Sequence, residues 1–270
     1  MATPLTAGSI GSGPLPQAWV EQEAFPVDDP VDPTDAAALL DYQAAAARAL
    51  VSLRDTRRGG AGHYVTYHWV LSFYGEHALT PLLGACAAAL TGCGLVQVPP
   101  DRVHLPLLRI GAADDLTAAA LARIEWTVRE WAGEQHQFRI RLGPPVLGPG
   151  GVRLCVSPWE ELLDLRHGLR RATRDVLGLR PWLRELIPFR PHVPIAYAMA
   201  DLAAAPLRER LAEAAEHRPV TLRIRRLNLL RISRNASDCD EQRAPRATRS
   251  AGGASWFTTA DVTLGRRTTF

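Results

Sequence analysis

Apolar and polar residues follow two different periods along the chain, one typical of strands and one typical of helices. Residues 220–225 alternate apolar and polar side chains, which predicts a strand. Residues 116–131 carry the apolar stripe of an amphipathic helix. The same reasoning predicts helices at 34–54, 79–90, 116–131, 159–177 and 202–217, and strands at 67–73, 102–110, 137–142, 152–156, 192–198, 220–225, 227–232 and 256–264. These elements predict an α+β fold, with a Pro- and Gly-containing hairpin loop at 143–151.

The two ends of the chain differ in composition from its centre. Residues 1–33 are rich in Pro, Gly and Asp and have no period, so we expect an extended or disordered arm. Thr34 is expected to cap the first helix, because an Ala- and Leu-rich stretch follows it. The expected division is an arm at 1–33, a helix and loop at 34–62, a main domain at 63–265 with a mobile loop at about 236–253, and a tail at 266–270.

Composition places the chain among globular proteins. It has 270 residues, of which 47% are hydrophobic and 22% charged. Residues 1–13 lack the pattern of a secretory signal, and no stretch reaches the roughly 18 apolar residues that span a bilayer, so we expect a cytoplasmic protein that uses no membrane. The four cysteines form neither a CxxC pair nor a zinc pattern, so we expect reduced thiols, no metal and no cofactor.

Positive charge is concentrated near the carboxyl end. All basic residues other than histidine are arginine, and from residue 218 onward arginines clearly outnumber acids. Such a segment can face a phosphate backbone, so nucleic acid is a possible partner. A solvated, arginine-rich strand face explains the same pattern and is the interpretation we favour. The sequence predicts no oligomeric state.

A short internal repeat is the strongest functional signal. Residues 100–107 (PDRVHLPL) match residues 188–195 (PFRPHVPI), with Pro, Arg, His and Pro at the same places. If the two units pair about a pseudo-twofold axis, His104 and His192 enter one groove. Two imidazoles with ordinary pKa values near ~6.5 suit general acid and base catalysis. A lone histidine of this kind is usually structural, whereas a pair at equivalent repeat positions favours a shared site.

At these residues a family resemblance becomes visible. The chain resembles the 2'-5' RNA ligase-like and cyclic phosphodiesterase branch of the 2H phosphoesterases, whose two lobes each carry a His-x-Thr/Ser-x motif on a strand. Here His104-Leu-Pro106-Leu and His192-Val-Pro194-Ile stand in those places. The resemblance implies that the two histidines act as acid and base on a phosphodiester without a metal, in an order that it leaves open.

The flanking segments agree with this resemblance. Residues 67–73 look like the family's opening strand, 227–232 like its penultimate strand and 256–264 like its closing strand. The ordered set is more specific than any one motif, and it covers roughly residues 63–265. It implies a bilobal fold in which two pseudo-twofold related lobes, each an antiparallel sheet with outer helices, surround a central cleft.

Both motifs depart from the family at the hydroxyl position. The family's Thr or Ser hydroxyls bind phosphate oxygens, whereas Pro106 and Pro194 offer neither a hydroxyl nor a main-chain N–H. A hydrogen bond to a charged group contributes about 1.5–3 kcal/mol. The loss of two such bonds therefore costs very roughly 10²–10⁴-fold in rate unless other groups replace them. The same change in both lobes favours a coordinated change of task.

Other side chains are candidates for substrate binding near the motifs. Arg102 and Arg190 lie two residues before each histidine, so strand alternation predicts that they share its face. Arg109 and Tyr197 lie five residues after the histidines and are expected on the opposite face, although the family places a tyrosine at the second position. His68 on the opening strand is expected to line the cleft or to pack in the core.

Three functions remain open from the sequence. The first is a phosphoesterase acting on a cyclic or 2'-5' phosphodiester in an RNA end or a small nucleotide. The second is a repurposed acid–base enzyme that performs an elimination, isomerisation or cyclisation on a small molecule without phosphate. The third is a non-catalytic module that binds RNA through its arginines. The repeated histidines favour the first function slightly over the second.

Overall fold

The computed structural model describes residues 31–55, 64–179, 189–234 and 254–265. The predicted mobile loop at 236–253, the tail at 266–270 and nearly all of the arm predicted at 1–33 lie outside the described residues. Within the described ranges, no helix combines the length and the apolar character needed to cross a membrane.

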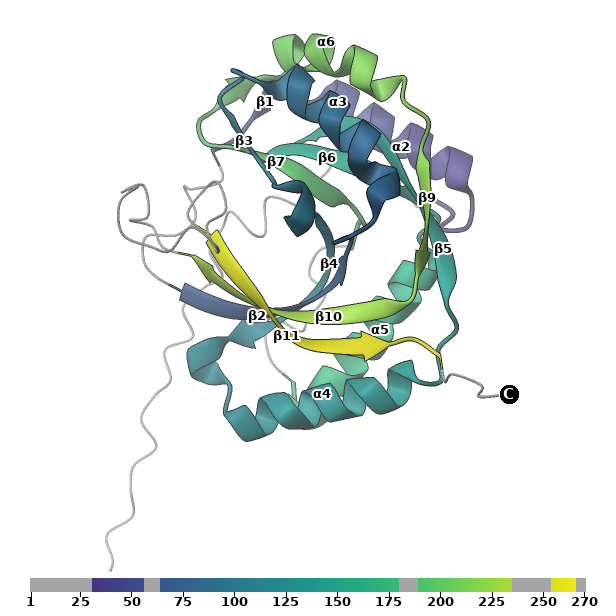
Figure 1. Cartoon of the computed structure of the whole chain (residues 1–270), viewed down its shortest axis with the longest axis vertical. Helices are drawn as coiled ribbons and strands as arrows, with labels where there is room; N and C mark the ends of the chain where they lie inside the picture. Colours follow the sequence, from purple (N-terminus) through teal and green to yellow (C-terminus); the bar gives the residue numbers. More distant parts are fainter. Residues whose placement is uncertain (1–30, 56–63, 180–188, 235–253, 266–270) are drawn as a thin grey trace, which may run out of the picture.

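Two antiparallel sheets contain most of the strands (Figure 1). The first, called here the β4 sheet, has the strand order β11-β10-β2-β4, and the second, called the β7 sheet, has the order β3-β7-β6-β5-β9. The β4 sheet consists of β2 (Tyr64–Ser72), β4 (His104–Ala112), β10 (Arg226–Arg234) and β11 (Ala254–Thr263). The β7 sheet consists of β3 (Leu95–Gln97), β5 (Phe138–Gly148), β6 (Gly151–Ser157), β7 (Val193–Ala198) and β9 (Val220–Ile224). A short pair, β1 (Ser52–Leu53) with β8 (Leu202–Ala203), stands apart from both.

Figure 1 shows the two sheets facing each other, with helices on their outer sides. Helices α4 (Ala118–Ala132) and α5 (Glu160–Leu177) lie beyond the β4 sheet, and α3 (Thr80–Leu90) and α6 (Ala204–Ala215) lie beyond the β7 sheet. The 3-10 turns are η2 (His77–Leu79), η3 (Pro100–Arg102) and η4 (Ala113–Asp115). Each repeated motif therefore belongs to a different sheet, as the predicted bilobal α+β fold requires.

The capping residue of helix α2 (Ala36–Ala49) lies one position after Thr34, the cap that the sequence predicts. The carboxylate of Asp35 accepts the main-chain N–H groups two and three residues on, so Asp35 is the cap and the prediction of Thr34 is wrong. The amide of Gln43 accepts from the N–H of Val156 and donates to its carbonyl oxygen, each at 3.1 Å. Helix α2 is thus hydrogen-bonded to β6 at Val156, beyond Leu154, which is the last β6 residue that pairs with β7.

The predicted hairpin loop at 143–151 is mostly strand. Strand β5 continues to Gly148 and β6 begins at Gly151, and a register shift between Leu142 and Pro145 accommodates the prolines. The sequence analysis also missed β1, β3 and β8. These strands have two or three residues, too few for a period, and their partners are distant in sequence.

The contact between α4 and α5 depends on Gly168. A Cβ atom there would lie 1.9 Å from the Trp131 ring, so Gly168→Ala is expected to overpack the helix pair and lower the free energy of unfolding by about 1–3 kcal/mol. Chemical denaturation measures this loss. The matched control is Gly84→Ala on α3, where the added methyl group meets nothing within 4 Å. Equal unfolding free energies for the two variants would contradict the packing argument.

Candidate active site

The two repeated histidines make the same hydrogen bond in the two halves of the molecule. Nδ1 of His104 lies 2.8 Å from the carbonyl oxygen of Arg102, and Nδ1 of His192 lies 2.9 Å from the carbonyl oxygen of Arg190. A carbonyl oxygen only accepts, so Nδ1 carries the proton in both rings. Nε2 is therefore the nitrogen of each imidazole that can exchange a proton with a substrate.

The two arginines before the histidines each contribute a main-chain carbonyl group to the site. Arg102 ends the 3-10 turn η3 and Arg190 precedes β7, so neither belongs to a strand and the predicted strand alternation does not apply to them. Their carbonyl groups orient the histidine rings. The Arg190 guanidinium lies 5.5 Å from the centroid of the Tyr42 ring, which is a cation–π contact.

Each motif strand contains a β-bulge directly after its proline. On β4, Pro106 pairs with Val70 and Leu108 with Trp69, so Leu107 is the extra residue. On β7, Pro194 pairs with Arg153 and Ala196 with Val152, so Ile195 is the extra residue there. The two halves thus repeat the irregularity as well as the sequence. A bulge is also one of the few places where a strand tolerates proline.

The bulges reverse the predicted orientation of two side chains. Arg109 pairs with His68, which shares a face of β2 with Val70, the partner of Pro106. Tyr197 pairs with Gly151, which shares a face of β6 with the partner of Pro194. Directly opposed residues point to the same face, so Arg109 and Tyr197 lie on the faces that carry the motif prolines. The prediction that they point away was wrong because it assumed regular strands.

Groups outside the ladders hold the bulged carbonyls. A guanidinium N–H of Arg166 on α5 donates to the carbonyl oxygen of Leu107. The N–H of Val98 donates to the carbonyl oxygen of Ile195 at 2.8 Å. The carbonyl group of each extra residue is therefore hydrogen-bonded, and the bulges set which side chains share a face with the motif prolines.

His68 lies on the same face of the β4 sheet as His104. It is 6% exposed, and its Nε2 is 2.8 Å from the hydroxyl oxygen of Thr66. The sequence left open whether His68 lines the cleft or packs in the core. The register places it on the face of β2 that pairs with His104 and Pro106, and it is buried there and does not line the cavity beside His104.

The surroundings of His192 lower its pKa from 6.5 to about 4. Burial contributes most, the positive charge of Arg153 adds to it, and the charge of His104 adds a smaller part. The hydrogen bond to the Arg190 carbonyl acts in the opposite direction and raises the pKa. His192 is therefore a neutral imidazole near pH 7. The contribution of His104 indicates that the two rings interact electrostatically.

This lowered pKa predicts how stability depends on pH. Between pH 6.5 and about 4 the unfolded chain binds a proton at residue 192 that the folded protein does not bind, so acidification through this range destabilises the fold. The loss is at most about 3 kcal/mol, because a shift of one pKa unit corresponds to ~1.4 kcal/mol. We expect His192→Asn to flatten the acid limb of the unfolding free energy measured by denaturant titration. His217→Asn, at an exposed position, is the control. If acid lowers the unfolding free energy of His192→Asn as steeply as that of His217→Asn, the electrostatic explanation is wrong.

Arg153 is the group near the histidines that the sequence analysis missed. It lies on β6 directly opposite Pro194 and is 7% exposed. Burial and the charge of Arg190 lower its pKa to about 10, so it stays charged at neutral pH. The strand predicted at 152–156 included this position, but no local pattern indicated that its partner would be the motif proline.

A cavity of about 680 Å³ opens beside His104. Its walls come from the end of β2, the start of β4, most of β9 and parts of β10 and β11, and His104 and Arg102 both line it. Its charged lining residues are four arginines and three acids, namely Arg102, Arg223, Arg225, Arg226, Glu76, Asp101 and Asp261. The arginine excess noted near the carboxyl end thus contributes to this wall. His192 is not among the described residues that line the cavity.

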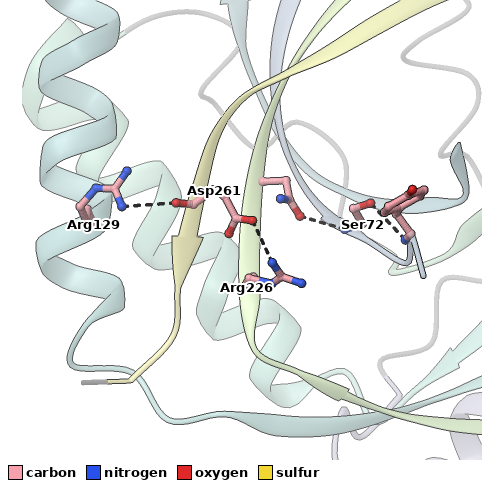
Figure 2. Close-up of polar contacts among 6 residues, drawn as sticks. Ser72, Arg129, Arg226 and Asp261 are labelled. Atoms are coloured by element: carbon pink, nitrogen blue, oxygen red, sulfur yellow. Dashed lines mark hydrogen bonds and ion pairs between the residues drawn. The ribbon is translucent and has the colours of Figure 1, made fainter. Parts of the chain in front are cut away.

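Figure 2 shows how one wall of the cavity is held together. A guanidinium nitrogen of Arg226 lies 3.2 Å from the carboxylate of Asp261, and Arg129 of α4 donates to the carbonyl oxygen of Asp261 at 3.3 Å. The N–H of Ser72 donates to the side-chain oxygen of Asn228 at 3.4 Å. These contacts join β11, β10 and β2 at the level of the cavity.

The described residues contain no group of three or more His, Cys, Asp or Glu side chains arranged to hold a metal ion. Cys86, Cys93 and Cys155 are free thiols, and burial raises the pKa of Cys155 to about 12. Cys239 lies outside the described residues.

Solved structures with the same architecture were found by comparison. TT0787 of Thermus thermophilus matches with a TM-score of 0.51 and 19% sequence identity, over 74% of this chain and 98% of its own. E. coli LigT complexed with 3'-AMP matches with a TM-score of 0.50 and 14% identity, also over 74% and 98%. Likeness at these identities establishes the fold alone. No curated protein sequence matches the chain.

A sequence model of one family gives a more specific result. The model of the 2'-5' RNA ligase superfamily matches residues 87–236, which is more than half of the chain. The match includes both repeated histidines and agrees with the bilobal fold. The chain therefore belongs to the 2'-5' RNA ligase superfamily of 2H phosphoesterases.

Proposed function

We infer that this protein cleaves or forms a cyclic or 2'-5' phosphodiester, in an RNA end or a small nucleotide, with His104 and His192 as its acid and base. The observation that carries the proposal is the matched pair of Nδ1 hydrogen bonds, which place the proton of each neutral ring on Nδ1 and make Nε2 its basic nitrogen. The mechanism needs no metal, because both proton transfers are assigned to imidazoles.

The lowered pKa of His192 favours one distribution of the two roles. A neutral His192 can accept a proton at Nε2 and so suits the base, which leaves the acid to His104. In hydrolysis of a 2',3'-cyclic phosphate, His192 takes a proton from water as the water oxygen attacks phosphorus. The bond from phosphorus to one ribose oxygen breaks, and His104 protonates that oxygen. Proton exchange with solvent then restores both rings.

The cavity supports a nucleotide-sized substrate. Its volume of about 680 Å³ lies within the range of small-molecule sites, and its arginines suit a phosphorylated ligand. The fold neighbour from E. coli was solved with 3'-AMP, which is a product of the kind that opening a cyclic phosphate yields. These observations favour a nucleoside phosphate or an RNA terminus over an apolar metabolite.

The proposal is tested with a set of phosphodiesters. Wild-type protein is incubated with each 2',3'-cyclic mononucleotide and a 2'-5' linked dinucleotide, with and without a chelator, and products are separated by chromatography. We expect turnover that the chelator does not change. Activity that requires added metal would contradict the two-histidine mechanism.

A second function is favoured by the apolar residues on the face of the β4 sheet that carries Pro106. Pro106 offers no hydroxyl, and its partner Val70 forms a buried apolar cluster with Leu230 and Ile232. A repurposed enzyme that moves protons on a molecule without phosphate would use such a surface. Folded wild type that turns over no phosphodiester, yet binds apolar small molecules through the two histidines, would support it. RNA binding that salt weakens and that survives loss of both histidines would instead indicate a non-catalytic module.

A further inference from the structure

The reaction requires a group that stabilises negative charge on the phosphate oxygens. The two prolines supply neither a hydroxyl nor an N–H at the places where the family has donors. A substitute is expected among the strand neighbours of Pro106 and Pro194, which share their faces. The neighbour of Pro106 is the aliphatic Val70, whereas the neighbour of Pro194 is Arg153.

The geometry directs Arg153 to the motif face of the β7 sheet. Directly opposed residues in an antiparallel pair share a face, so the Arg153 side chain lies on the face of Pro194 and Tyr197. Its guanidinium lies over Gly148 of the neighbouring strand. A Cβ atom at Gly148 would lie 3.0 Å from Cζ of Arg153, so the glycine leaves room for the guanidinium.

Positive charge converges at this point. Burial is the largest cause of the lowered pKa of both His192 and Arg153, and in addition the charge of Arg153 lowers the pKa of His192 and the charge of Arg190 lowers that of Arg153. Three nitrogen groups that repel one another when charged thus lie near each other. A bound anion relieves this repulsion, and a guanidinium holds phosphate oxygens through two parallel hydrogen bonds.

We propose that Arg153 binds a phosphate oxygen of the substrate beside His192, in the place of the hydroxyl that Pro194 lacks. The inference deepens the proposed phosphodiester function and rests on it for the identity of the substrate. It assigns anion binding in this half of the site to a residue of β6 outside both repeated motifs.

The test compares Arg153→Met, which keeps the length of the side chain, with Arg153→Lys, which keeps its charge. Arg174→Met on the exposed face of α5 is the control. The first readout is inorganic phosphate binding, followed through the imidazole signals of His192 by NMR titration. In wild type we expect phosphate to raise the pKa of His192, because the bound anion favours the protonated ring. In Arg153→Met we expect a phosphate Kd about 10–100-fold weaker, the range expected for a hydrogen bond to a charged group.

The second readout is turnover of a 2',3'-cyclic nucleotide. We expect Arg153→Met to lower kcat/KM by about 10–100-fold. Arg153→Lys should recover part of the loss but not the full value, because an ammonium does not form the parallel pair of bonds. Thermal unfolding verifies that each variant is folded, and partial rescue by Arg153→Lys excludes a purely structural explanation for Arg153→Met.

The outcomes separate this inference from the function on which it rests. Phosphate binding that is equally tight in wild type and Arg153→Met overturns the inference, whether or not the wild type is active. Arg153-dependent phosphate binding in a protein that turns over no phosphodiester supports the anion site and contradicts the proposed function. Loss of both binding and turnover in Arg153→Met supports both.

Discussion

Replacement of either motif histidine by asparagine is expected to lower kcat/KM for a 2',3'-cyclic nucleotide by about 10²–10⁴-fold, the usual contribution of a positioned acid or base. Asparagine is the informative replacement because its amide can still donate to the carbonyl oxygen of Arg102 or Arg190. The substitution therefore keeps the local hydrogen bond and removes only the nitrogen that exchanges protons. Steady-state kinetics measure the effect.

The control for both variants is His217→Asn, at an exposed position just beyond α6. It should retain wild-type turnover. A variant at His104 or His192 that is folded and keeps more than about a tenth of wild-type kcat/KM would contradict its assignment, since a loss of that size is far below the usual acid–base contribution.

Restored hydroxyls at both motif positions are expected to rescue the loss of Arg153. In an Arg153→Met background, the combined change Pro106→Thr and Pro194→Thr should raise kcat/KM by about 10²-fold, from two new hydrogen bonds to a charged phosphate. In the wild-type background the same pair should gain only about tenfold, from the hydroxyl at position 106, because the Arg153 guanidinium already binds the phosphate beside Pro194. Threonine suits these strand positions because it is β-branched.

The control for the rescue is Pro106→Val with Pro194→Val, which reproduces the shape of threonine without its hydroxyl. It should leave kcat/KM of Arg153→Met unchanged. If the two valines raise kcat/KM as much as the two threonines do, the gain comes from the removal of proline. The explanation through the hydroxyls would then be wrong.

The repeated motif is the feature of the site that the sequence predicted best. Eight residues with Pro, Arg, His and Pro in register predicted one histidine in each half of an α+β fold, and the shared groove of the two histidines stays a prediction. Hydrophobic periodicity depends only on residues that are close in the sequence. Most of the predicted helices and strands therefore also agree with the structure. Boundaries differ by a few residues, as at Thr34 and Asp35, because two good capping residues stand side by side.

The orientation of side chains around the histidines could not be predicted in the same way. Strand alternation assumes an unbroken ladder, but extra residues at Leu107 and Ile195 bring Arg109 and Tyr197 to the motif faces. Contacts from Arg166 and Val98, both distant in sequence, hold these bulges. Bulges of this kind depend on tertiary partners, which a single sequence does not reveal.

Arg153 was missed for a related reason. It lies in a fully buried strand whose neighbours otherwise give an apolar pattern, and its link to the site is a cross-strand pairing with Pro194. The pairing of β6 with β7 joins segments separated by the whole of α5, so the partner of Arg153 could be identified only from the fold.

The most direct test of the account compares wild type, His104→Asn, His192→Asn and the double variant on one 2',3'-cyclic mononucleotide in a chelator-containing buffer, followed by 31P NMR. If the histidines form one acid–base pair, the wild type converts the cyclic diester to a monoester. The double variant should then be no more than about tenfold slower than either single variant, because groups that act as a unit are not additive. A folded wild type without turnover, or losses that multiply in the double variant, would contradict the account.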